Sequence, residues 1–103
     1  MKDSFTVHDL PLDERPRERM MHEGADKISA QELLAVLLGR GVAGQSVMNI
    51  ARDLMKQFKT LEAIVNASLE DLQQIKGLGP AKALQLKASL EIARRVIDAE
   101  RTK

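Results

Sequence analysis

The chain has 103 residues, enough for one compact domain, because domains usually contain roughly 100–150 residues. Lys and Arg number 16 against 15 Asp and Glu, so the net charge of +1 does not single out a nucleic-acid, membrane or acidic-substrate binder. Cysteine is absent, which excludes disulfides, thiolate nucleophiles and cysteine metal ligands. The only aromatic residues are two phenylalanines, too few for a protein that stacks bases on aromatic side chains.

The sequence carries no membrane or export signal. No apolar run approaches the ~20 residues of a membrane helix, and the N-terminus lacks the apolar stretch of a signal peptide. Together with the absence of cysteine, this predicts a cytoplasmic protein with no membrane partner. Because His8 and His22 are the only histidines and lie far apart, we also expect no metal, no cofactor and no catalytic activity.

The first 40 residues predict an extended segment and two helices. Residues 1–15 are punctuated by proline and form an extended or turn-rich lead-in. Pro16 suits the first position of a short helix that ends at Gly24. Ser29-Ala30-Gln31-Glu32 is a capping box that begins a second helix, running to Leu38. Because this helix is apolar nearly all round, we expect it to be the central helix of the core.

The rest of the chain predicts further helices, each with its own start signal. Ser46, Thr60 and Ser68 are N-cap residues, and the helix after Ser68 should run to Ile75. A long helix follows over residues 80–101. Its predicted core face consists of Ala83, Leu86, Leu90, Ala93 and Ile97.

No segment alternates apolar and polar residues for long, so the predicted fold class is all-α. We expect a small bundle of five to six helices that forms one domain over residues 16–101.

The segment 72–83 is the most informative in the chain. Gly77 and Gly79 permit a tight reversal, Leu78 between them can point inward, and Pro80 starts the next helix. The amide groups at such a helix start face outward without partners, beside Lys76 and Lys82. Unpaired amides and the helix dipole both favour an anion, and a phosphate diester is the leading candidate.

This segment resembles the helix-hairpin-helix motif of DNA-repair and recombination proteins, found in RuvA domain 2-like and SAM-like bundles. In that family the hairpin amides hold a backbone phosphate without reading sequence. The resemblance implies the amides of Gly77, Gly79 and Ala81 or Lys82 as donors. Some members also bind a monovalent cation on hairpin carbonyls, which correspond here to those of Gln73, Ile75 and Leu78.

The similarity extends beyond the hairpin. Residues 10–18, 29–38 and 66–72 resemble the N-terminal domain of the bacterial RadC family, and with the hairpin they span nearly the whole chain. In that family a metalloprotease-like domain of the JAB/MPN type follows, and none of its zinc ligands is present here. The resemblance implies an N-terminal part of a longer protein, with residues 102–103 beginning a linker and the C-terminal domain as a partner.

Charge and a second loop extend the candidate interface. Segment 72–95 has an excess of basic residues, with Glu91 as its only acidic residue. The basic residues are Lys76, Lys82, Lys87, Arg94 and Arg95. We take Lys87 as a further phosphate contact, although it could equally be a solvated helix face. Residues 34–51 resemble a degenerate second hairpin, in which Arg40, Gly41 and Gly44 are candidates for a secondary DNA contact.

The sequence therefore predicts a non-catalytic, sequence-independent module for duplex or branched DNA, with no small-molecule substrate. We expect bulkier residues at Gly77 and Gly79 to weaken DNA binding without unfolding the domain. The alternative is a protein-interaction scaffold whose hairpin binds nothing. A base-excision glycosylase is rejected, because Asp98 would lie late on a continuous helix with no second subdomain to form a pocket.

Overall fold

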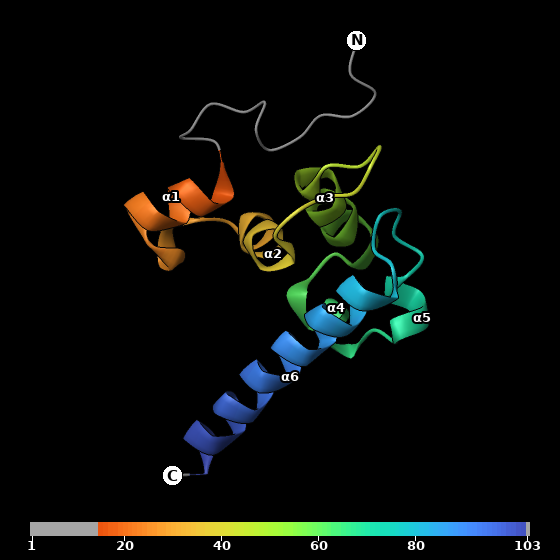
Figure 1. The fold of residues 1–103 in the computed structure, drawn as a ribbon. Helices are drawn as coiled ribbons and strands as arrows, with labels where there is room; N and C mark the ends of the chain where they lie inside the picture. Colours follow the sequence, from red (N-terminus) through yellow and green to blue (C-terminus); the bar gives the residue numbers. More distant parts are fainter. Residues whose placement is uncertain (1–14, 103) are drawn as a thin grey trace.

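The computed structural model describes residues 15–102. Residues 1–14, which include His8 and most of the predicted lead-in, lie outside this part, and so does Lys103. The described chain contains α1 (Pro16–Glu23), a short 3-10 helix η3 (Ala25–Lys27), α2 (Ala30–Leu38), α3 (Val47–Phe58), α4 (Leu61–Asn66), α5 (Leu69–Leu72) and α6 (Pro80–Arg101) (Figure 1). It contains helices and no strand over these residues, so the predicted all-α fold is confirmed.

The predicted helix starts are confirmed at the level of individual hydrogen bonds. The Ser29 hydroxyl accepts from the Glu32 amide while the Glu32 carboxylate accepts from the Ser29 amide, which completes the capping box. The hydroxyl groups of Ser46, Thr60 and Ser68 each accept from the amide three residues later. Each of these helices therefore begins at a signal that the sequence carries locally.

The core lies between α2, α3 and the first half of α6, closed by α4 and α5. The largest interface is that of α2 with α3. Leu33 of α2 is exposed, but α2 contacts α1, α3 and α6, so the prediction that it is the central helix of the core is confirmed. Helix α3 is the more deeply buried of the two, since Ile50, Ala51 and Leu54 are fully inaccessible. The buried residues of α3, which are Val47, Ile50, Ala51 and Leu54, recur with the helical period, so one face of this helix is apolar and lies in the core.

Helix α1 is held against α2 by a charged contact. Arg19 donates to Glu32 at 2.6 Å, and the same carboxylate closes the capping box. Burial alone would raise the pKa of Glu32, but the hydrogen bonds from Ser29 and the charge of Arg19 outweigh it and lower the pKa. Glu32 therefore stays ionised in both of its contacts.

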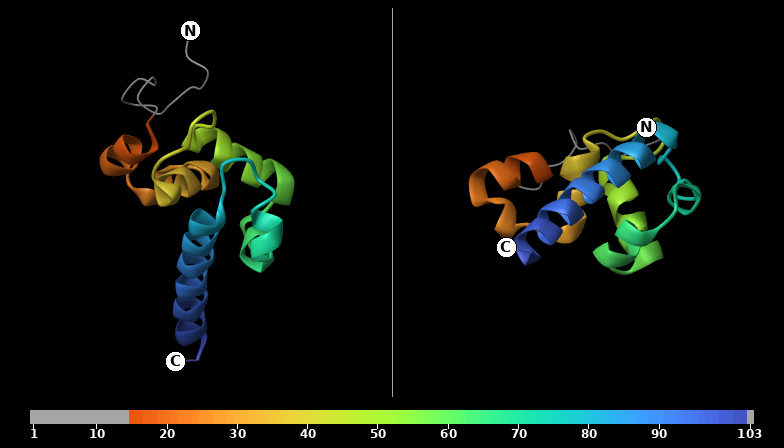
Figure 2. Two further views of the ribbon diagram at one scale, coloured as in Figure 1. Left: turned by 45° about the vertical axis from the view of Figure 1, so that its right-hand side comes forward. Right: turned by 90° about the horizontal axis from the view of Figure 1, so that it is seen from below.

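Two predicted helices differ from those observed. Helix α5 ends at Leu72 and not at Ile75, because the amides of Gln74 and Ile75 bond three residues back and continue the chain as tighter turns. Helix α6 has the predicted length, but only its first half packs on the bundle. Figure 2 shows the second half projecting away, and there Ile97 is 56% exposed although it was predicted to face the core. Ala93 is exposed as well.

One side chain connects the loop between α2 and α3 with the loop between α5 and α6. Gln45, in the loop between α2 and α3, is 7% exposed, and its Nε2 donates to Asp53 Oδ2 at 3.0 Å. The same nitrogen donates to the Lys76 carbonyl at 3.3 Å, in the loop between α5 and α6. Because an amide nitrogen has two hydrogens, both bonds can form together. Gln45 thus fixes one loop against the other.

Replacing Gln45 by Ala should lower the free energy of unfolding by about 1–3 kcal/mol, because the Asp53 carboxylate and the Lys76 carbonyl lose a donor. Gln57→Ala on the exposed side of α3 is the matched control and should change it by no more than about 0.5 kcal/mol. Urea denaturation of both variants measures the difference. Equal stabilities would contradict the role given to Gln45.

Candidate nucleic-acid interface

The hairpin loop between α5 and α6 is anchored by two buried side chains. Ile75 and Leu78 are 7% and 1% exposed, and the inward position of Leu78 agrees with the prediction from the sequence. The Leu78 amide donates to the Ile75 carbonyl at 3.0 Å, so this amide is occupied within the loop. Leu78 therefore positions the hairpin, and the residues around it are the ones presented to solvent.

The two glycines of the hairpin differ in what the fold demands of them. Gly77 has a φ of +92°, and a Cβ there would lie 2.9 Å from Ile50 Cδ1 and 3.0 Å from Gln45 Cγ. The expectation that Gly77 can be enlarged without disturbing the fold is therefore wrong. Gly79 has a φ of −78°, and a Cβ there would meet no atom within 4 Å. The described fold gives no steric reason for glycine at position 79.

Bare amide groups surround Gly79. Ala83 donates the first bond of α6, to the Gly79 carbonyl at 2.9 Å. Among residues 15–102, no acceptor is bonded to the amides of Gly77, Gly79, Ala81 or Lys82. Gly79 and Ala81 are exposed and Gly77 and Lys82 are partly buried, so the amides of Gly79 and Ala81 are the accessible ones at the positive end of a 22-residue helix. The structure brings together the amides that the sequence singled out.

The three lysines near the hairpin have different surroundings. Lys76 is exposed, and its ammonium has no partner within the described residues. The Lys82 ammonium donates to the Leu38 carbonyl at 3.0 Å, and that of Lys87 donates to the Val65 and Ala67 carbonyls at 3.0 and 2.8 Å. The last two therefore cap the C-terminal ends of α2 and α4, where cations are favoured.

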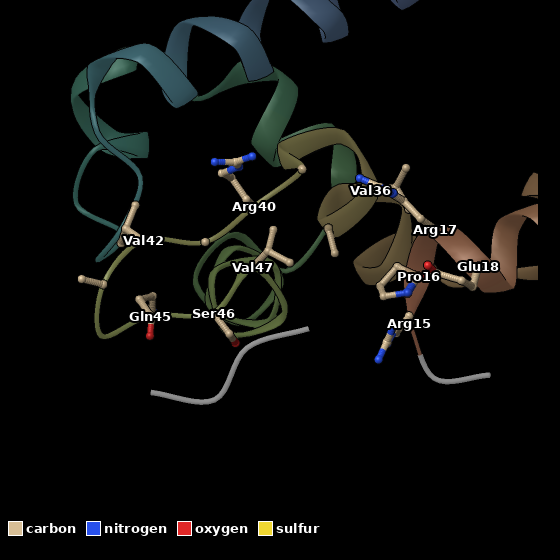
Figure 3. Close-up of a pocket in the computed structure, with 14 residues that line it drawn as sticks. Arg15, Pro16, Arg17, Glu18, Val36, Arg40, Val42, Gln45, Ser46 and Val47 are labelled. Atoms are coloured by element: carbon tan, nitrogen blue, oxygen red, sulfur yellow. The ribbon is translucent and has the colours of Figure 1, made fainter. Parts of the chain in front are cut away.

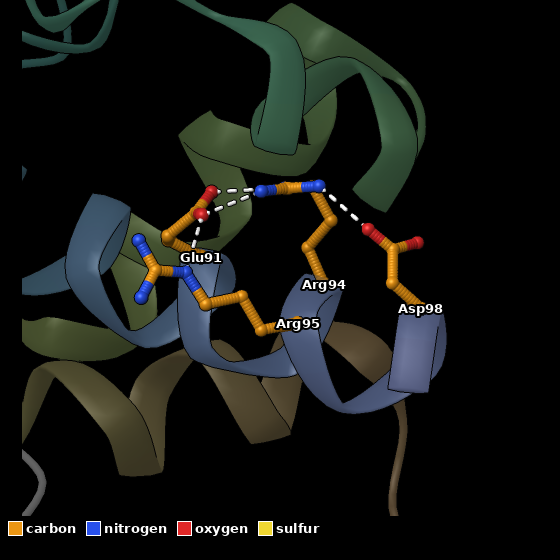
Figure 4. Close-up of polar contacts among 4 residues, drawn as sticks. All are labelled: Glu91, Arg94, Arg95 and Asp98. Atoms are coloured by element: carbon orange, nitrogen blue, oxygen red, sulfur yellow. Dashed lines mark hydrogen bonds and ion pairs between the residues drawn. The ribbon is translucent and has the colours of Figure 1, made fainter. Parts of the chain in front are cut away.

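The arginines of the basic flank are paired along α6 (Figure 4). Arg94 binds both oxygens of Glu91, at 3.0 and 2.7 Å, and reaches Asp98 at 2.7 Å. Arg95 donates to Glu91 at 3.0 Å. Hydrogen bonds from Arg94 and then Arg95 lower the pKa of Glu91 to about 2. The excess of basic residues in segment 72–95 is thus partly neutralised, and Lys76 is the hairpin cation with an unengaged head group among the described residues.

The loop between α2 and α3 borders a cavity of about 420 Å³ (Figure 3). Arg40 and Gly41 line it, and Gly44 does not. Gly41 is required by the fold, because a Cβ there would lie 2.3 Å from the Gln45 carbonyl oxygen. Gly44 has a φ of +81° and serves the turn in which Val42 and Gln45 exchange backbone hydrogen bonds. Arg40 is exposed at this surface.

The carbonyls that the resemblance proposes for a cation lie in the same hairpin. That of Ile75 already accepts the Leu78 amide. Within residues 15–102, no group of three or more acidic or histidine side chains could hold a metal ion. No helix of this part is long and apolar enough to cross a membrane.

Sequence reasoning missed the side chains that connect these elements. Gln45 bridges the two loops, and Gln85 donates to the Leu37 carbonyl at 2.8 Å beside the Lys82 cap. Each contact joins residues far apart in the chain, and a polar residue in a loop or on a helix gives no local signal of its distant partner. For Lys87 the sequence offers a solvated residue or a phosphate contact, and it does not reveal the Val65 and Ala67 carbonyls to which the ammonium donates.

Comparison with known proteins places this arrangement in a family. The family described as "UPF0758 N-terminal" matches residues 7–84, which is most of the chain. The chain belongs to the UPF0758 family. UPF0758 is the RadC-like family, so the family resemblance seen in the sequence is confirmed. No solved structure matches the chain.

The curated relatives are named only as UPF0758 proteins. One from Janthinobacterium sp. (strain Marseille) is 47% identical over 96 residues, covering 93% of this chain and 43% of the relative. One from Desulforamulus reducens is 47% identical over 90 residues, covering 87% and 40%. One from Geobacillus kaustophilus is 40% identical over 93 residues, covering 90% and 41%. The chain spans about two fifths of the length of these relatives.

Alanine substitutions at Gly77 and Gly79 should distinguish the glycine that the fold requires from the one that it does not require. Gly77→Ala should lower the free energy of unfolding by about 2 kcal/mol or more, because a side chain is strained at this φ and crowds Ile50. Gly79→Ala should lower it by at most about 0.7 kcal/mol, the cost of a poorer N-cap residue. Chemical denaturation measures both. A Gly79 variant as unstable as the Gly77 variant would contradict this difference.

Replacing Arg94 by Gln should raise the pKa of Glu91 from about 2 toward 4.5, because its main hydrogen-bonding partner is lost. Arg95→Gln should raise the pKa less. In the unaltered chain the ion pairs are complete above about pH 4.5 and are lost as the pH falls through about 2. Carboxyl-carbon NMR titration follows the group directly. A pKa near 4.5 before any substitution would show that these arginines are unpaired.

Proposed function

We propose that this chain is a non-catalytic, sequence-independent DNA-binding module. The observation that carries the proposal is the exposed surface around Gly79. There, unpaired amides lie at the start of a long helix, and a glycine stands where the fold has room for a side chain. A DNA phosphate is an anion of suitable size for these donors, and the absence of a Cβ lets a bulky backbone approach them.

Lys76 supplies the charged contact in this proposal. Its exposed ammonium lies in the hairpin itself, whereas those of Lys82 and Lys87 point at helix carbonyls and contribute mainly long-range potential. Arg40 adds a cation on the neighbouring loop, which Gln45 holds in a fixed relation to the hairpin. Few cations engage phosphate, so binding is weak, and log K should fall against log salt with a slope of about −1 to −3.

The contacts proposed here are made to backbone phosphate, so they position the module and do not select a sequence. In the cell, the module would hold the remainder of a RadC-like protein on duplex or branched DNA during repair or recombination. The family resemblance supports this role, and the cytoplasm would be its location. The hairpin amides and Lys76 carry the binding, and no residue is assigned a catalytic role.

A second candidate function is a protein-interaction scaffold. The exposed apolar side chains on the second half of α6 favour it, because such residues are the usual core of a protein interface. Titration of labelled DNA followed by amide NMR separates the two functions. Shifts clustered on residues 76–83 support DNA binding, and shifts elsewhere or none support the scaffold.

Lys76→Glu should weaken binding to duplex or branched DNA about tenfold at ~50 mM salt, because it replaces the free cation of the hairpin by an anion. Lys27→Glu in η3 changes the net charge equally on the other side of the bundle (Figure 1) and should change the affinity less than about twofold. Fluorescence anisotropy measures both variants.

Gly79→Val tests the amide surface apart from charge. It should weaken DNA binding by a similar factor while circular dichroism shows a folded chain, because a Cβ at this position meets no protein atom. Equal affinities of the Lys76, Lys27 and Gly79 variants, or no binding of the unaltered chain to any DNA at ~50 mM salt, would overturn the proposal.

A further inference from the structure

The second half of α6 exposes an apolar face that the bundle does not cover. Every residue from Ile92 to Thr102 is exposed. Ile92, Val96 and Ile97 are 65%, 57% and 56% exposed, values more typical of polar side chains. Figure 2 shows this part of the helix extending beyond the other elements. We call these three residues the distal stripe.

The distal stripe lies on a different side of α6 from the paired residues Glu91, Arg94 and Asp98. Ile92 and Val96 are one turn apart, and Ile97 follows Leu86 and Leu90 on the helical period of the core face. Glu91, Arg94 and Asp98 lie on another side, where they are paired with one another (Figure 4), whereas Glu100 lies one turn beyond Val96 on the apolar side. A helix built in this way is amphipathic beyond the bundle and leaves its apolar side without a neighbour among the described residues.

The paired charges indicate the chemistry of the partner. Because the carboxylates of Glu91 and Asp98 already bind arginines of the same helix, an approaching surface need not supply a charge to them. The stripe itself consists of branched aliphatic side chains, which are stabilised by burial against other apolar groups. The matching surface is therefore apolar and aliphatic.

A second copy of this chain does not match the stripe in size. At roughly 100 Å² for each exposed side chain of this kind, two stripes would bury about 600 Å². A stable dimer usually buries at least about 1,200 Å². A surface on the same polypeptide needs much less, since linkage gives it a millimolar effective concentration.

The relatives supply such a surface. More than half of the Janthinobacterium relative lies outside the part that this chain matches. The matched family is the N-terminal one, so in these relatives the remainder follows the region that corresponds to α6. The distal stripe lies at that junction.

We propose that Ile92, Val96 and Ile97 form the docking face for the C-terminal part of full-length UPF0758 proteins. In this arrangement α6 is shared: its first half completes the bundle and its second half packs on the following part of the protein. The two parts are then held in one orientation and not joined by a loose tether. This proposal stands independently of DNA binding, because it uses the opposite end of α6 from the hairpin.

The test uses the full-length Janthinobacterium relative in which the matching N-terminal part is replaced by this chain. Deuterium exchange of the peptide 88–99 is compared with that in the chain alone, and exchange over α3 checks folding in both. We expect exchange of 88–99 to be at least about tenfold slower in the full-length protein. Ile92→Glu, alone or with Val96→Glu, should return it to the rate of the isolated chain.

Leu84→Glu is the matched control, because Leu84 is a comparably exposed apolar residue of α6 outside the stripe. It should leave the slow exchange unchanged. Equal exchange in the isolated chain and the full-length protein would overturn the proposal. So would a dimer of the isolated chain in sedimentation that Ile92→Glu abolishes, because the occupant would then be a second copy.

Discussion

The hydrogen bonds of the Gln45 side chain are the interaction on which the candidate interface depends. One amide nitrogen connects the loop before α3, α3 itself through Asp53, and the backbone of the hairpin at Lys76. Gly77 packs against the same side chain, in space that a Cβ would fill. Gln45 is itself buried, and neither loop can move alone without breaking one of its two hydrogen bonds. The hairpin is therefore presented as part of a rigid unit that includes the second loop.

Local signals in the sequence were sufficient for most of the fold. The capping box at Ser29, the other N-cap residues, Pro16 and Pro80 each act within one turn of the helix they begin, so their effect can be predicted without the rest of the structure. The buried Leu78 followed from the same local logic. The predictions that failed concern burial, which depends on residues far apart in the chain. The exposure of Ile97 depends on where the bundle stops, and the helical period carries no information on that.

In the candidate site, too, the features with a local signal were predictable and those that depend on distant residues were not. The bare amides around Gly79 were predictable, because they follow from a helix start. The roles of the lysines were not, because the partners of Lys82 and Lys87 lie 44 and 20–22 residues away in the chain. A basic residue near a phosphate site can equally be a helix cap, and only its surroundings decide. The electrostatic part of the proposed function therefore rests on Lys76 more than on the total charge of the segment.

The three donors that α6 sends to other helices have a consequence for its alignment. Lys82, Gln85 and Lys87 reach the ends of α2 and α4 from one stretch of the helix. A slip of α6 by one residue would rotate this stretch by about 100° and remove all three donors from their carbonyls at once. Leucines and alanines alone would tolerate such sliding better. These three hydrogen-bond donors thus fix the register of α6 against α2 and α4. They thereby determine how far the helix start protrudes at Gly79 and how much of α6 extends past the bundle.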